Sequence, residues 1–156
     1  MAQKITKTDT ERLSGALNAF AQGHAIHAWR NLGAHPEQRD GKAGYVFRVW
    51  APNAAGVSLM GDFNGWDRGS HPMTLLQNGI WEGFVPGLAR YDAYKFAVTT
   101  RDGRVLDKAD PFAFHAETRP GTASKVYDLS GYQWGDKKWM AWRAKHLVYH
   151  QPLNIY

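Results

Sequence analysis

The sequence predicts a mainly β protein, an antiparallel β-sandwich with short N-terminal helices and a C-terminal linker. Apolar residues recur at helical spacing before residue 43, alternate with a period of two between residues 44 and 130, and lose that alternation afterwards. Within the central stretch, turn-forming residues arrive at intervals of roughly ten, as in small sandwiches. We therefore expect a helical segment (1–43), a sandwich (44–130) and a linker (131–156).

The helical segment is expected to hold two short helices. The stretch Thr8–Glu11 supplies N-capping side chains ahead of apolar residues at helical spacing, and Gly23 would end this helix. Those apolar residues are Leu13, Ala16, Leu17 and Phe20. A second helical piece is expected at about residues 25–32, because Gly33 and Pro36 follow it.

The central stretch is expected to contain six strands. They lie near residues 45–50, 56–60, 79–85, 93–100, 105–106 and 124–128. The dipeptide Asp102-Gly103 predicts a hairpin turn after the fourth of them. In that fourth strand, alternation places Tyr94 and Phe96 in the core and Lys95 on the outer face. The Lys95 ammonium could there reach sugar hydroxyls, or it could be an ordinary solvated lysine.

The composition limits the class of protein. The chain has no cysteine, which excludes a disulfide framework and a cysteine zinc site. Its first residues lack the apolar run of a signal peptide, and no stretch approaches membrane-spanning length. We expect a cytoplasmic protein with no membrane partner.

The net charge of +5 raises the question of nucleic-acid binding. The expected sandwich carries nine basic and nine acidic residues, so the excess charge lies in the flanking segments. The linker cations are interpreted as a solvated face; they are Lys137, Lys138, Arg143 and Lys145. Because phosphate binding needs clustered cations on the folded surface, we expect no nucleic-acid partner.

Motifs for catalysis, metals and cofactors are missing from the sequence. Asp102, Asp107 and Asp110 could approach one another, but without the buried pairing that tunes a general acid. His24 and His27 are three residues apart with no supporting carboxylates, so a metal there is disfavoured. We expect no catalytic residue, no metal and no cofactor in this chain, and interpret it as a binding or scaffolding module.

Trp66 is the strongest binding candidate. It lies among small and polar residues in the loop 63–67, where an exposed indole can stack on a sugar ring. Asn64 or Asp67 would bond the sugar hydroxyls. The alternative is that Trp66 folds back as a residue at the rim of the core.

The other tryptophans are interpreted differently. Trp50 and Trp81 lie in apolar strands and are expected in the core. Trp134, Trp139 and Trp142 are expected to pack against whatever follows the sandwich, because exposed tryptophans in a linker are a liability. We also expect the natural polypeptide to continue beyond Tyr156.

Several motifs together carry a family resemblance. They are Phe47 to Trp66, Gly79-Ile80-Trp81-Glu82, Tyr94-Lys95-Phe96, Lys108 to Ala113, Arg119 to Ser124, Leu32 to Pro36 and Pro152 to Tyr156. With these motifs the chain resembles the N-terminal region of bacterial 1,4-α-glucan (glycogen) branching enzymes. Its central part is similar to their family 48 carbohydrate-binding module, an immunoglobulin-like (E-set) sandwich.

The resemblance implies a parent enzyme that cleaves an α-1,4 linkage and forms an α-1,6 branch by retaining chemistry. Its Asp nucleophile and Glu acid/base would lie beyond Tyr156, and residues 152–156 would lead into the first strand of its (β/α)8 barrel. The implied partners are α-1,4-glucan, as maltooligosaccharide or glycogen, and the barrel of the same polypeptide. The fragment alone is expected to have no branching activity.

The resemblance also implies site residues. In sister modules that bind glycogen, the residues matching Trp66 and Lys95 contact the glucan. Other binders add a second tryptophan after the hairpin turn, where this chain has Arg104 and Val105. We therefore expect weak binding, on the order of millimolar.

Two alternatives stay open. One is a purely structural sandwich that packs on the barrel and has no glucan site. The other is the same module from a debranching or trehalose-forming relative.

Overall fold

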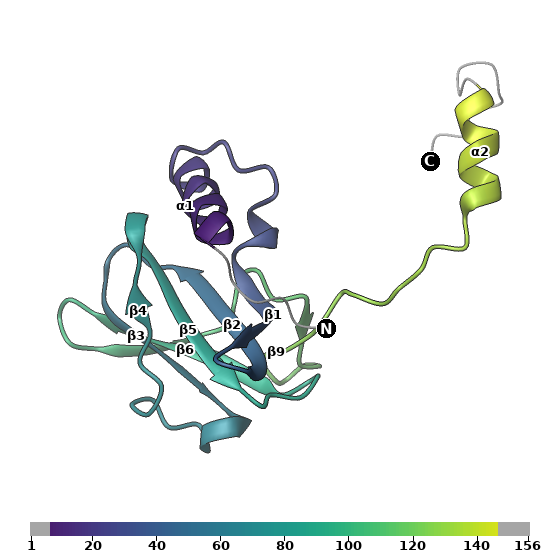
Figure 1. The fold of residues 1–156 in the computed structure, drawn as a ribbon. Coiled ribbons are helices and arrows are strands. Elements are labelled where there is room, and N and C mark those ends of the chain that lie inside the picture. Colours follow the sequence, from purple (N-terminus) through teal and green to yellow (C-terminus); the bar gives the residue numbers. More distant parts are fainter. Residues whose placement is uncertain (1–6, 147–156) are drawn as a thin grey trace.

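The fold is that of a computed structural model, which describes residues 7–146 (Figure 1). Residues 152–156, which were expected to lead into a barrel strand, lie outside the described residues. The helical elements are α1 (Lys7–Ala21), η1 (Ala28–Arg30), η2 (Asp62–Asn64), η3 (Gln77–Gly79) and α2 (Lys137–Lys145). The strands are β1 (Gly33–Arg39), β2 (Lys42–Trp50), β3 (Ala54–Gly61), β4 (Thr74–Leu75), β5 (Ile80–Pro86), β6 (Ala93–Thr100), β7 (Val105–Lys108), β8 (His115–Ala116) and β9 (Ser124–Lys125).

Two antiparallel sheets face each other and enclose the core, which confirms the predicted sandwich. The first sheet has the order β1-β2-β5-β4, and the second has the order β3-β6-β9-β8 with β7 paired to β6. Phe47 of the first sheet meets Tyr94 of the second edge to face at 4.8 Å between ring centroids. Both side chains are fully buried, as is Phe96. The predicted core face of β6 is therefore correct.

Helix α1 lies along the outer side of the first sheet (Figure 1). Leu17 of α1 is buried in a small second cluster with Leu32 and Ile80. Polar contacts add to this packing, because the Gln77 amide donates to the Ser14 carbonyl at 2.8 Å. The first predicted helix is confirmed, and its docking gives the sandwich a helical cover on one side.

The boundary predicted at residue 44 is wrong. Residues 33–39 form strand β1 rather than part of a helical segment, and β1 pairs with β2 along its whole length. The turn between them is Asp40-Gly41, with φ of 49° and 75°, the pattern of a two-residue hairpin. This dipeptide carries the same hairpin signal as Asp102-Gly103. The second predicted helix is reduced to the single 3-10 turn η1.

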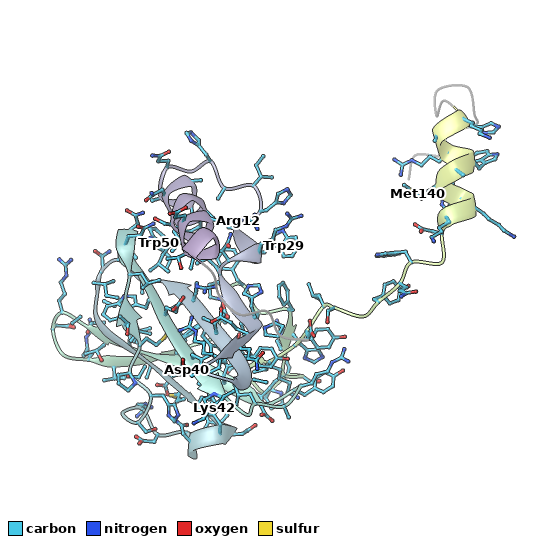
Figure 2. All side chains as sticks on the ribbon, in the orientation of Figure 1. Arg12, Trp29, Asp40, Lys42, Trp50 and Met140 are labelled. Atoms are coloured by element: carbon cyan, nitrogen blue, oxygen red, sulfur yellow. The ribbon has the colours of Figure 1, made fainter. Side chains whose placement is uncertain are left out.

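Trp50 is not a core residue, contrary to the prediction, whereas Trp81 is. Trp50 is 52% exposed and Trp81 is 8% exposed. Trp50 is the last residue of β2 and lies beside α1 (Figure 2). Its ring packs edge to face on Phe20 of α1 at 5.8 Å between ring centroids. Its indole N–H donates to the Asn78 carbonyl. Trp50 thus closes the rim between helix and sheet instead of filling the sandwich.

The segment after the sandwich extends away from it and ends in α2 (Figure 1). The sequence predicted the loss of strand pattern here but not this helix. None of the residues of α2 is buried, and Trp134, Trp139 and Trp142 are 72%, 55% and 47% exposed. Across residues 7–146 no helix has the length and apolar character to span a membrane.

Candidate functional site

The loop after β3 holds Trp66 at the surface. The backbone N–H of Trp66 donates to the Gly61 carbonyl at 2.9 Å, and its indole N–H donates to the Asp62 carboxylate at 3.1 Å. The second oxygen of that carboxylate accepts the backbone N–H of Ala93 at 2.9 Å. Asp62 therefore ties the loop and the indole to the start of β6. Trp66 is 36% exposed, so it lies at the surface rather than in the core.

Asn64 is committed to shaping this loop. Its side-chain oxygen accepts the Gly61 N–H at 2.9 Å, and its amide nitrogen lies within 3.3 Å of four acceptors in the loop. These acceptors are the carbonyls of Leu59 and Asp67, the Ser70 hydroxyl and a His71 ring nitrogen. An amide nitrogen has two hydrogens, so these partners already use its donor capacity. Asn64 positions Trp66 rather than offering a donor to a ligand.

Asp67 is exposed on the same loop. One of its carboxylate oxygens accepts the backbone N–H of Gly69 at 2.9 Å, which forms a tight turn. Asp67 therefore has a structural role in this turn, and a role toward a ligand stays a prediction.

Lys95 lies close to this loop on the outer face of the second sheet. It is paired across the strands with Met60, one position before Gly61, which anchors the Trp66 backbone. Its ammonium donates to the Thr122 hydroxyl at 2.7 Å. The structure therefore brings Trp66 and Lys95, which are 29 positions apart in the sequence, to the same end of β3 and β6.

Arg68 and Asp107 belong to the same surface, and sequence reasoning missed their pairing. The Arg68 guanidinium forms two hydrogen bonds with the Asp107 carboxylate, at 2.9 and 2.6 Å. Hydrogen bonding to Arg68 holds the pKa of Asp107 below its usual value, and the nearby Lys95 charge lowers it further. Asp107 faces outward beside Ala97 in the strand register. Alternation in residues 105–108 could have placed it there, but nothing local identifies Arg68 as its partner.

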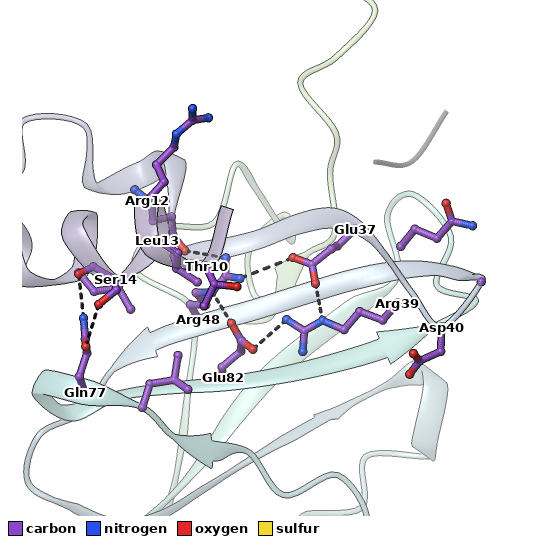
Figure 3. Close-up of a pocket in the computed structure, with 15 residues that line it drawn as sticks. Thr10, Arg12, Leu13, Ser14, Glu37, Arg39, Asp40, Arg48, Gln77 and Glu82 are labelled. Atoms are coloured by element: carbon purple, nitrogen blue, oxygen red, sulfur yellow. Dashed lines mark hydrogen bonds and ion pairs between the residues drawn. The ribbon is translucent and has the colours of Figure 1, made fainter. Parts of the chain in front are cut away.

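A cavity of about 1230 Å³ lies elsewhere, between α1 and the first sheet (Figure 3). Its polar lining is a network in which Glu82 accepts from Arg48 at 2.6 Å and from Arg39 at 2.8 Å. Glu37 also pairs with both guanidinium groups. These charges satisfy one another, and none of the sequence-predicted site residues lines the cavity. We therefore favour the surface around Trp66, where a flat ring is exposed beside polar groups.

The aspartates that were considered for catalysis are used structurally. Asp110 is buried and accepts the Tyr94 hydroxyl at 2.6 Å, and burial raises its pKa. Asp102 pairs with Arg104 at the exposed hairpin tip. Within residues 7–146 no group of three histidine or acidic side chains is placed to hold a metal ion.

More than half of the chain matches a known protein family. Residues 31–113 match the profile of carbohydrate-binding module 48, described as the isoamylase N-terminal domain. The chain belongs to this family. The matched residues include most of the sandwich strands and the Trp66 loop.

The relatives are long enzymes. The 1,4-alpha-glucan branching enzyme GlgB of Butyrivibrio fibrisolvens is 49% identical over 158 residues, covering 100% of this chain and 24% of that enzyme. The GlgB of Parasynechococcus marenigrum is 47% identical over 137 residues, covering 88% of this chain and 18% of the enzyme. The chain therefore spans less than a quarter of the length of these two relatives.

A similar fold occurs in a solved structure of a pullulanase from Anoxybacillus sp. LM18-11, complexed with maltotetraose. The TM-score is 0.52 with 25% sequence identity, and the match covers 70% of this chain and 15% of the pullulanase. This likeness agrees with the immunoglobulin-like sandwich that was expected from the sequence.

Proposed function

We propose that this chain is an α-glucan-binding and scaffolding module of a 1,4-α-glucan branching enzyme. The complete enzyme would form α-1,6 branches in glycogen, in the cytoplasm. Membership of carbohydrate-binding module 48 and 47 to 49% identity to branching enzymes over most of the chain support the assignment. The observation that carries it is the placement of Trp66 and Lys95 at one end of β3 and β6.

Each residue would have a distinct role in binding. The exposed indole of Trp66 stacks on the apolar face of a glucose ring, as aromatic rings in sugar sites do. The Lys95 ammonium has three donors, of which Thr122 takes one, so it can donate to hydroxyls. Asp67 accepts from a hydroxyl, and Asn64 keeps the loop in the required shape.

The proposed affinity is low. One aromatic ring contributes about 0.5–1.5 kcal/mol beyond its buried area, whereas association costs at least about 4 kcal/mol. We expect a dissociation constant on the order of 1 mM for a maltooligosaccharide. Glycogen presents many chain ends, so several modules bound to one particle would be held by avidity.

The scaffolding role concerns the rest of the enzyme. The three exposed tryptophans of residues 134–142 offer apolar surface of the kind that a neighbouring domain buries. We propose that they pack against the catalytic barrel of the same polypeptide. The linker before α2 would then set the distance between the glucan site and the barrel.

The test is an NMR titration of the 156-residue chain with maltoheptaose, comparing the wild type with Trp66→Ala. Saturable shifts around Trp66 and Lys95 that vanish in Trp66→Ala would support the proposal. Trp134→Ala is the matched control, since it removes an exposed indole from the linker and should leave the binding curve unchanged. If the wild type shows no shifts at high ligand concentration, the module serves architecture alone.

A further inference from the structure

Two bulky aromatic residues have an unusual backbone conformation. Among the described residues, the non-glycine residues with positive φ are Asp40, Trp66, Asn78 and Tyr91. Asp and Asn tolerate this left-handed region, whereas a bulky aromatic residue there is an outlier that the surrounding structure must hold in place. Trp66 is the residue already assigned to glucan. Tyr91 has φ of 79° and no assigned role.

Tyr91 is held by backbone hydrogen bonds in the loop between β5 and β6. Its N–H donates to the Val126 carbonyl at 2.8 Å, and the Val126 N–H donates to the Asp92 carbonyl at 3.0 Å. Val126 itself is fully buried. The ring of Tyr91 is nevertheless 47% exposed, so the backbone is anchored while the side chain faces solvent.

Two rings and one cation surround Tyr91. Its ring centroid lies 5.2 Å from that of His115 and 5.7 Å from that of Tyr127. The Arg90 guanidinium carbon lies 4.0 Å from the Tyr127 centroid and 5.2 Å from the Tyr91 centroid. Tyr127 and His115 therefore support the exposed ring, and Arg90 places donors beside it.

This cluster shares a sheet face with Lys95. His115 is opposite Lys125, and Lys125 is opposite Ala93 in the strand register. Residues opposite each other share a face, and so do residues two apart along a strand, so His115 lies on the same outer face as Lys95. Strand spacing and residue rise put their Cα atoms about 12 Å apart. Trp66 follows β3, and Tyr91 bonds to Val126 just after β9, so an oligosaccharide running from one ring to the other crosses β6 near Lys95.

We infer that Tyr91 forms a second aromatic platform for the same α-glucan chain that Trp66 binds. The inference rests on the proposed function. The hairpin after β6 offers no second ring, because Val105 is 45% exposed there and Arg104 pairs with Asp102. Tyr91, with Arg90 as a hydroxyl donor, supplies a second ring at the same end of the strands, across β6 from Trp66. A glucan long enough to reach both rings is bound more tightly than a short one.

The test compares maltotriose with maltoheptaose on the 156-residue chain, with affinities read from the backbone amide shifts of the Trp66 loop, which every variant retains. Tyr91→Ala should weaken maltoheptaose binding about fivefold, the effect of losing one stacking ring. It should leave maltotriose binding at Trp66 unchanged. Tyr132→Ala is the matched control, because Tyr132 is an exposed tyrosine in the linker, 70% exposed, and its loss should change neither affinity.

The outcomes separate this inference from the proposed function. If Trp66→Ala abolishes binding while Tyr91→Ala and Tyr91→Gly leave both affinities intact, the glucan site stands and the second platform is wrong. A wild-type chain that binds neither sugar overturns both. Tyr91→Gly serves as the second variant because glycine adopts positive φ without strain, so its fold does not depend on the lost ring.

Discussion

Asn64 illustrates how one side chain determines the presentation of another. Its amide connects the end of β3 to the turn at residues 67–71, and the indole of Trp66 projects from the loop so fixed. Sequence reasoning assigned Asn64 to the ligand because amides are good partners for hydroxyls. The loop itself uses those hydrogen bonds, since polar groups at a half-buried turn must be satisfied.

His35 gives a pH dependence at the residue scale. Burial lowers its pKa from the ordinary 6.5, and the charge of Arg48 lowers it further, against the opposing hydrogen bond with the Leu32 carbonyl. The unfolded chain thus takes up a proton at higher pH than the folded protein. The stability due to His35 is present above about pH 6.5 and is lost as the pH falls below it.

Urea denaturation between pH 7.5 and 5 measures this effect. The free energy of unfolding should fall more steeply for the wild type than for His35→Gln, with a difference in slope of at most about 1.4 kcal/mol per pH unit. Glutamine keeps a donor for the Leu32 carbonyl. Parallel curves for the two proteins would show that His35 titrates alike in both states.

Tyr91 allows the cost of its backbone conformation to be measured. Tyr91→Ala and Tyr91→Gly both remove the ring, but only alanine keeps a Cβ atom at φ of 79°. We expect Tyr91→Gly to be more stable than Tyr91→Ala by about 1 kcal/mol in urea denaturation. A glycine variant no more stable than the alanine variant would mean that this loop relaxes to negative φ.

At the scale of elements, ion pairs align the strands of the first sheet beneath α1. Arg39 of β1, Arg48 of β2 and Glu82 of β5 meet across three adjacent strands (Figure 3). The side chains of Arg48 and Glu82 are only 8% and 14% exposed. Because neither charge is well hydrated, loss of one partner leaves the other in a poor environment.

We expect Glu82→Gln to lower the free energy of unfolding by about 3 kcal/mol, at the lower end for a broken buried pair because Glu37 remains. Chemical denaturation measures the change. Asp102→Asn is the comparison, since the exposed Asp102–Arg104 pair should contribute nothing measurable. Equal effects of the two substitutions would contradict the buried role of Glu82.

At the scale of the whole molecule, stability resides in the sandwich and its α1 cover. The core side chains come from residues 17–126, and α2 contributes no buried residue. The helices α1 and α2 therefore differ in how much they contribute to the stability of the fold. Helix α1 is part of the folded unit, whereas α2 buries no residue against it.

A proline in each helix tests this difference. Ala141→Pro should remove helical circular dichroism from α2 but shift the melting temperature of the sandwich by less than about 2 °C. Ala16→Pro, in the docked helix α1, should lower the melting temperature clearly, because it disrupts the helix that buries Leu17. A large shift from Ala141→Pro would show that α2 packs on the sandwich.

The sequence by itself determined the sandwich, the first helix, the Asp102-Gly103 hairpin and the core face of β6. Each depends on neighbours a few residues apart, through alternation, helical spacing or turn chemistry. It also singled out Trp66 from the composition of its loop and Lys95 from the alternation of its strand, and the family resemblance pointed to the same two residues. It missed β1 because residues 33–39 show no alternation of apolar and polar residues, and it misplaced Trp50 because alternation does not say where a strand ends.

Only the tertiary structure decided which side chains meet. The bond from Lys95 to Thr122, the pair of Arg68 and Asp107, and the grouping of Tyr91 with His115 and Tyr127 join residues far apart in the chain. They follow from strand register, which is set by packing across two sheets. No local pattern contains that information, because the register is the outcome of burying the whole core at once.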